Sequence, residues 1–145
     1  MRIIGLLFIY VVFIYGGSQD ALITCHSTSG RTQLKIYDMD LEGNFQSGFL
    51  SIDGKKIKYD ETSDAAIVSH LEKGVYTVYL YTNKATYFLK FYALPKTVKQ
   101  LAYRKGEKYK FKGIIDSATT DPRSKKRINK TIVVECLAIY KWKEI

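Results

Sequence analysis

The residues best suited to bind a charged ligand are basic and gather in the last third of the chain. The run from 123 to 130 holds five Lys or Arg residues in eight positions, and three lysines alternate along the stretch before it. These candidate polyanion-binding residues are Lys108, Lys110, Lys112, Arg123, Lys125, Lys126, Arg127 and Lys130. Such a group attracts phosphate or sulfate polymers and anionic lipid headgroups through long-range attraction and counterion release. Alternatively, the same residues only solvate a loop and protect an edge strand from aggregation.

Residues able to carry catalysis are few and scattered. His26 and His70 are the two histidines, and no serine lies in a Gly-x-Ser-x-Gly setting. The two cysteines and two histidines do not have the spacing of a metal site. We therefore expect no catalytic residues, no metal and no cofactor, and a protein that is not an enzyme. Two alternatives stay open: a hydrolase acting on a cell-wall or extracellular polymer, and a carrier of a small apolar ligand.

The first residues predict export. Arg2 is followed by an apolar run over 3–15 and by the small residues Gly16, Gly17 and Ser18. This is the layout of a secretory signal peptide, and the run is short for a membrane span of roughly 20 residues. We expect a signal peptide at 1–18 and a single periplasmic or secreted domain at 19–145. Removing 1–18 takes away one arginine and no acidic residue, so the net charge falls from +9 to +8.

The two cysteines, Cys25 and Cys136, lie near the two ends of the expected mature chain. An exported protein meets an oxidising compartment, where such a pair is expected to form a disulfide. Two buried free thiols are one alternative. Lipidation of Cys25 is another, although Gln19 and Asp20 separate it from the apolar run.

Alternation of apolar and polar residues predicts an all-β protein. Asp53-Gly54 lies between two such runs and indicates a two-residue hairpin. Tyr109 and Phe111 alternate with lysines, and one face of the last strand extends from Ile132 to Trp142. About eight short strands in one domain favour an antiparallel β-sandwich or a small β-barrel.

Two segments depart from this alternation. Ser63–Lys73 begins with a capping residue and is followed by Gly74, so it predicts either a short helical turn or an irregular strand. Residues 116–130 are small, polar or charged and contain Pro122, which predicts an exposed loop. If the strand of Lys108, Lys110 and Lys112 pairs with the last strand, this loop caps the lysines, and both sets form one positive surface.

The stretches LITCHSTSGRTQLKIYDMD, LSIDGKKIKY and TTDPRSKKRINKTIVVECLAIY give the chain a recognisable layout. In this layout it resembles small exported bacterial all-β proteins of unassigned function, with one cysteine in the first strand and one in the last. The resemblance implies an envelope or secreted location and a disulfide between Cys25 and Cys136. It implies nothing about chemistry.

Together these features predict a non-enzymatic binding or structural role in the cell envelope. The expected partner is an anionic envelope polymer, lipid headgroups or another envelope protein. Nucleic acid is the weaker candidate for an exported chain.

Overall fold

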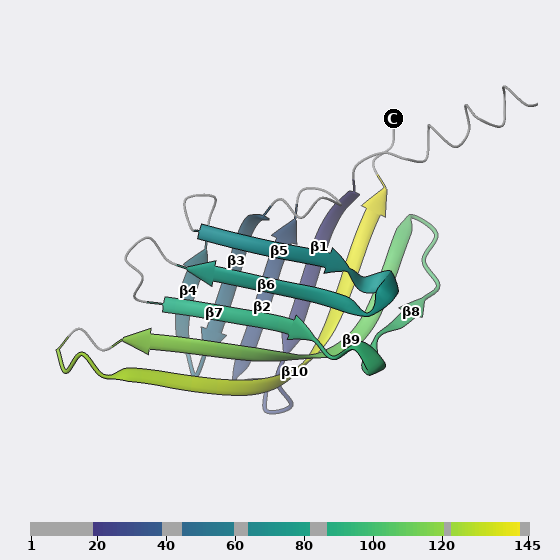
Figure 1. The fold of residues 1–145 in the computed structure, drawn as a ribbon. Helices are drawn as coiled ribbons and strands as arrows, with labels where there is room; N and C mark the ends of the chain where they lie inside the picture. Colours follow the sequence, from purple (N-terminus) through teal and green to yellow (C-terminus); the bar gives the residue numbers. More distant parts are fainter. Residues whose placement is uncertain (1–18, 39–44, 60–63, 82–86, 121–122, 143–145) are drawn as a thin grey trace, which may run out of the picture.

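The computed structural model describes residues 19–38, 45–59, 64–81, 87–120 and 123–142, and the expected signal peptide lies outside them. Within these ranges the chain forms ten strands and two single-turn 3-10 helices (Figure 1). The elements are β1 (Gln19–His26), β2 (Thr32–Asp38), β3 (Phe45–Ile52), β4 (Lys55–Tyr59), β5 (Asp64–His70), η1 (Leu71–Lys73), β6 (Val75–Tyr81), β7 (Tyr87–Ala93), η2 (Pro95–Thr97), β8 (Lys99–Leu101), β9 (Gly106–Thr120) and β10 (Arg127–Trp142).

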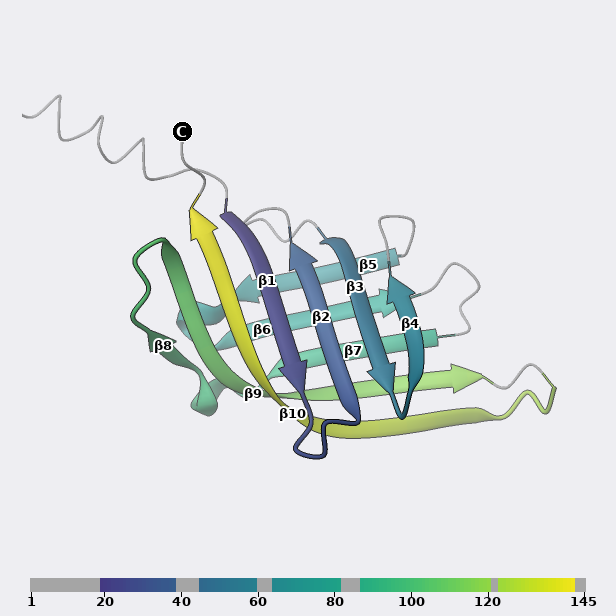
Figure 2. The ribbon, with the colours of Figure 1, turned by 180° about the vertical axis from the view of Figure 1, so that it is seen from behind.

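All ten strands belong to one antiparallel sheet. Its order is β4-β3-β2-β1-β10-β9-β7-β6-β5, and β8 pairs with the start of β9. The sheet folds over on itself into two layers whose strands cross steeply (Figures 1 and 2). The predicted all-β antiparallel class is confirmed. The described residues hold ten strands rather than about eight, because β5 and β8 lie where alternation in the sequence is weak.

The long hairpin of β9 and β10 forms the corner between the layers. Residues 106–112 of β9 and 135–142 of β10 lie in the layer that also contains β1 to β4 and β8, called here the first layer. In this layer β9 pairs with β8, and β10 pairs with β1. From Gly113 onward β9 pairs with β7, in the second layer with β5 and β6. A Cβ at Gly113 would lie 2.5 Å from Cε2 of Phe91, so this position requires glycine for Phe91 to pack against the bend.

The core lies between the layers and is built from alternate residues of every long strand. Its largest fully buried side chains are Tyr59, Tyr76, Phe91, Phe111, Ile23, Leu34, Ile36, Leu50, Leu80, Leu89, Ile115 and Val78. The rings of Phe91 and Phe111 lie 6.3 Å apart, and Tyr76 contacts Phe91 at 5.9 Å. Aromatic side chains of this size bury the most apolar area and therefore dominate the stability of the packing.

Local sequence signals account for several turns. Asp53 and Gly54 both have positive φ, 48° and 82°, and join β3 to β4 as the predicted two-residue hairpin. The ambiguous segment 63–73 contains both expected structures, a strand (β5) followed by one helical turn (η1). Gly74 ends that turn in the left-handed conformation, with φ 79°.

Two predictions from the sequence are wrong. Residues 116–130 are not one exposed loop, since β9 continues to Thr120 and β10 begins at Arg127. Residues 117–119 pair with β7, and this tertiary pairing overrides their weak strand preference. Trp142 does not continue the buried face of β10; its side chain is 45% exposed, beyond the last buried residue, Tyr140.

Candidate polyanion-binding surface

The three lysines of β9 point away from the core. Tyr109 and Phe111 are buried between the layers, whereas Lys110 and Lys112 are exposed and Lys108 is half-buried. This alternation follows directly from the two-residue period of a strand. The prediction that these lysines share one outward face is therefore confirmed.

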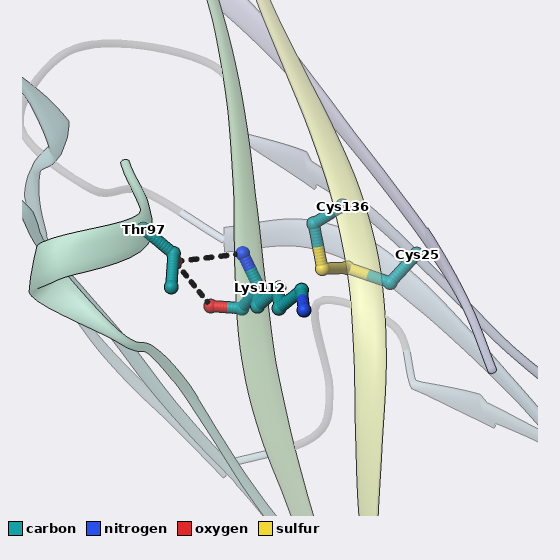
Figure 3. The surroundings of a disulfide bond; sticks show 4 residues. All are labelled: Cys25, Thr97, Lys112 and Cys136. Carbon is teal, nitrogen blue, oxygen red and sulfur yellow. Dashed lines mark hydrogen bonds between the residues drawn. A yellow bond between two sulfur atoms is a disulfide. The ribbon is translucent and has the colours of Figure 1, made fainter. Parts of the chain in front are cut away.

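A short connection brings two further lysines beside them. After β7, η2 fills the space along β9, and its Thr97 hydroxyl accepts a hydrogen bond from the Lys112 N–H at 2.9 Å (Figure 3). The same hydroxyl donates to the Leu94 carbonyl at 2.7 Å, so Thr97 holds the turn against the strand. Lys96 lies in this turn, and Lys99 begins β8 directly after it.

These residues line a depression of about 410 Å³ on the outer side of the first layer. Its lining is Lys96, Thr97, Lys99, Lys110, Phe111, Lys112 and Glu135. Lys99 and Lys110 are directly opposite in the β8–β9 ladder, and Lys112 is opposite Glu135 in the β9–β10 ladder. In the described part of the chain, no carboxylate lies within ion-pair distance of the four lysines that line the depression. Like charges placed directly opposite destabilise a strand pair, so this arrangement favours an anion between them.

The basic surface continues across the first layer, which Figure 2 shows from its outer side. Strand register places one transverse row in the order Lys99, Lys110, Leu137, Thr24, Lys35, Phe49 and Lys58. We define the lysine face as the outward side chains of Lys35, Lys56, Lys58, Lys99, Lys108, Lys110 and Lys112. Four of these residues were not predicted from the sequence, because the sequence alone does not show which strands are neighbours. They are Lys35, Lys56, Lys58 and Lys99.

The basic residues at the β9–β10 turn lie far along the hairpin from Lys108, Lys110 and Lys112. Thr120 pairs with Arg127 at the end of the hairpin, eight residues from Lys112, which corresponds to about 27 Å along the strand. In Figures 1 and 2 this hairpin tip lies beyond β4, on the far side of the sheet from β8. The two strands pair as expected, but their length carries the tip away from Lys108, Lys110 and Lys112, so the tip does not cap these three lysines.

The residues of the tip are well exposed. Arg123, Lys125, Lys126 and Arg127 are all exposed to solvent. Lys130 forms an exposed ion pair with Asp53 of the β3–β4 turn, with its Nζ 3.1 Å from Oδ2. Exposed pairs of this kind contribute about 0–1 kcal/mol, so Lys130 remains available to another anion.

The predicted disulfide lies behind the lysine face. Cys25 and Cys136 are register partners in the β1–β10 ladder, and a bond joins them (Figure 3). Both residues are almost fully buried, with exposed fractions of 0% and 3%. Disulfides persist in oxidising compartments, so the bond indicates a non-cytoplasmic environment.

The histidines do not converge with other catalytic groups in the described residues. His26 is exposed and lies opposite Glu135 in the β1–β10 ladder. His70 is exposed as well, with Nδ1 3.4 Å from the Glu72 carboxylate. The described ranges hold no cluster of three metal-ligating side chains, and none of their helices has the length and apolar character to cross a membrane.

Models of known protein families, curated proteins and solved structures provide no match to this chain. The resemblance to small exported bacterial all-β proteins stays a prediction.

Proposed function

We propose that this protein is an exported, non-enzymatic domain that binds an anionic polymer at its lysine face. The observation that carries the proposal is the direct pairing of Lys99 with Lys110 at the edge of a depression that also contains Lys96 and Lys112. A phosphate, sulfate or carboxylate group between the two ammonium groups replaces their repulsion by two attractive interactions.

The shape of the face supports a polymeric ligand over a small one. Lys108, Lys110 and Lys112 follow one another along β9 at intervals of about 6.7 Å, two residues of an extended strand. The transverse row then continues over β2 to β4 through Lys35 and Lys58. A linear chain of anionic groups can contact several of these lysines at once, whereas a single anion can contact only those of the depression.

Two features support an exported location. The buried disulfide favours an oxidising compartment, and the expected signal peptide at 1–18 would bring the chain there. We place the protein in the periplasm or outside the cell, where anionic envelope polymers are available.

The test uses heparin as the anionic probe and the mature chain, residues 19–145, which contains every strand that the structure describes. Binding is measured between about 50 and 300 mM salt, a range over which screening changes strongly. The triple variant K99Q/K110Q/K112Q removes three lysines of the depression. The matched control K125Q/K126Q/K130Q removes the same charge from the hairpin tip, so net charge is equal in the two proteins.

Counterion release predicts the size of the effect. With a factor of about 0.7 per contact, losing three contacts lowers affinity roughly 100-fold at 0.1 M salt and reduces the log–log salt slope by about 2. The control should retain most of the wild-type affinity. If the control is the weaker binder, the tip is the site; if wild type does not bind at about 50 mM salt, the proposed function is wrong.

A second arm separates the possible sources of the anion. Vesicles with anionic headgroups and a single-stranded DNA oligonucleotide are tested under the same conditions. We expect heparin to bind more tightly than either of them. Preferential binding to the vesicles would instead identify lipid headgroups as the ligand of the lysine face.

A further inference from the structure

The described sheet has four unpaired edges, and three of them carry basic residues. The outer strand β4 contains Lys55, Lys56 and Lys58, and β8 begins with Lys99. The free edge of β10, before its pairing with β1, contains Arg127 and Lys130. Lysine and arginine on an edge strand oppose pairing with another chain, because that pairing would bury or juxtapose their charges.

The fourth edge, β5, lacks this protection. Residues 65–69, Ala-Ala-Ile-Val-Ser, contain no charged residue and no proline, and among the described strands β5 pairs only with β6. Neither β5 nor β6 contains a lysine or arginine, although the chain as a whole has 23. An edge segment without lysine or arginine, and with unpaired N–H and C=O groups, is a template for the addition of another strand.

Several apolar side chains are exposed on the outer surface next to this edge. Val68 is 50% exposed, and Val75 and Tyr81 of the neighbouring strand are 39% and 43% exposed. The Tyr81 ring contacts the Phe88 ring with centroids 4.8 Å apart, which extends this surface onto β7. Apolar side chains beside a free edge add burial to the main-chain hydrogen bonds of strand addition.

We propose that a second copy of this chain pairs with β5 through its own β5, antiparallel about a twofold axis. Charge favours this surface over the others, since two copies of the mature chain, each with a net charge of +8, repel each other wherever lysines face one another. The lysine face belongs to the first layer, whereas β5 and β6 belong to the second, so pairing at β5 keeps the two lysine faces out of the contact.

The strand is self-complementary in the antiparallel direction, as an isologous interface requires. With Ile67 on the axis, Ala66 lies opposite Val68 of the second copy, and Ala65 lies opposite its Ser69. On the outer side a small residue thus faces a larger one, and on the inner side two small residues face each other, so neither pairing is crowded. Ile67 already packs against the core, and its counterpart extends that core across the axis.

The test is the mass of the mature chain in solution, measured by sedimentation over a concentration series. Wild type should sediment as a dimer, and V68K should be monomeric because each copy brings a new charge to the edge. V133K is the matched control: Val133 is 56% exposed and also lies on a free edge, in β10, so this variant should remain a dimer.

Amide exchange provides a readout without any variant. Dimerisation should slow exchange in residues 65–69 as concentration rises. Salt should strengthen the dimer, because it screens the repulsion between the two positive chains, whereas it weakens polyanion binding. A wild-type chain that is monomeric at about 100 μM, or a V68K variant that is as dimeric as V133K, would overturn the proposal.

Discussion

Reduction of the Cys25–Cys136 disulfide should destabilise the protein strongly without changing its fold. The bond closes a loop with a sequence separation of 111 residues, nearly the whole mature chain. Chain-entropy theory assigns a loop of this length about 4.8 kcal/mol, through the freedom that the bond removes from the unfolded state. The folded state loses little, because β1 and β10 still pair over eight register positions when the bond is open.

That loss is large compared with the total stability. At 0.05–0.15 kcal/mol per residue, a mature chain of 127 residues has about 6–19 kcal/mol, so the reduced protein stays folded with a much smaller margin. At about 4 °C per kcal/mol for this size, the melting temperature should fall by roughly 20 °C. Because both sulfurs are buried, reduction should be slow in the folded protein and fast when urea is present.

The assay is urea unfolding of the mature chain with and without a phosphine reductant. The control is C25A/C136A, in which the reductant should have no effect. Intact mass measurement establishes the starting state, since the disulfide form is two hydrogens lighter than the dithiol and lacks any lipid. A stability change below about 1 kcal/mol on reduction would contradict the loop-entropy argument.

Two further predictions concern the corner hairpin. Gly106→Ala should lower the free energy of unfolding, measured in urea, by about 1–3 kcal/mol, because the added Cβ would overlap the Tyr140 carbonyl oxygen and force the strands apart. A change of less than about 0.5 kcal/mol would show that this end of the hairpin adjusts freely. Burial, the Glu107 charge and a 3.3 Å hydrogen bond to that carboxylate raise the pKa of Tyr109 from 10.0 to about 12, so the neutral phenol stabilises the fold below pH 10. This contribution to the free energy of unfolding should be lost as pH rises through 10 to 12, and the Tyr109→Phe variant should lose less stability over that range. Equal losses of stability in both proteins would rule out Tyr109 as the titrating group.

Local patterns predicted the parts of the fold that depend on neighbours in sequence. The Asp53-Gly54 turn, the buried and exposed sides of β9, and the inward position of Cys136 each follow from residue type and a period of two. The pairing of the two cysteines followed from their number and the expected compartment. None of these inferences needed to know which strands are adjacent.

Features that depend on pairing between distant strands were not predictable in this way. The polar end of β9 is a strand because its residues 113–119 pair with β7, and residues 127–134 of β10 pair with β9 in turn; local propensity does not encode these contacts. The extent of the lysine face was underestimated for the same reason, since three successive strand pairings link Lys110 to Lys35 and five link it to Lys58. The unprotected edge of β5 likewise appears only once every other edge has been located.

Dimerisation through β5 should also change how the protein binds long polymers. A dimer formed through β5 would carry two lysine faces, both outside the contact, so one long polymer could bind both. Linking two binding sites raises apparent affinity by roughly 100-fold or more when the ligand spans them. Wild type should therefore bind long heparin chains much more tightly than short fragments that cover a single face.

Val68→Lys should remove this advantage specifically. The variant keeps each lysine face intact, so its affinity for short fragments should equal that of wild type, while its affinity for long chains falls to a similar value. Val133→Lys adds the same charge and should retain the preference for long chains. Equal chain-length dependence in the two variants would mean that dimerisation and polyanion binding are not linked, even if each occurs separately.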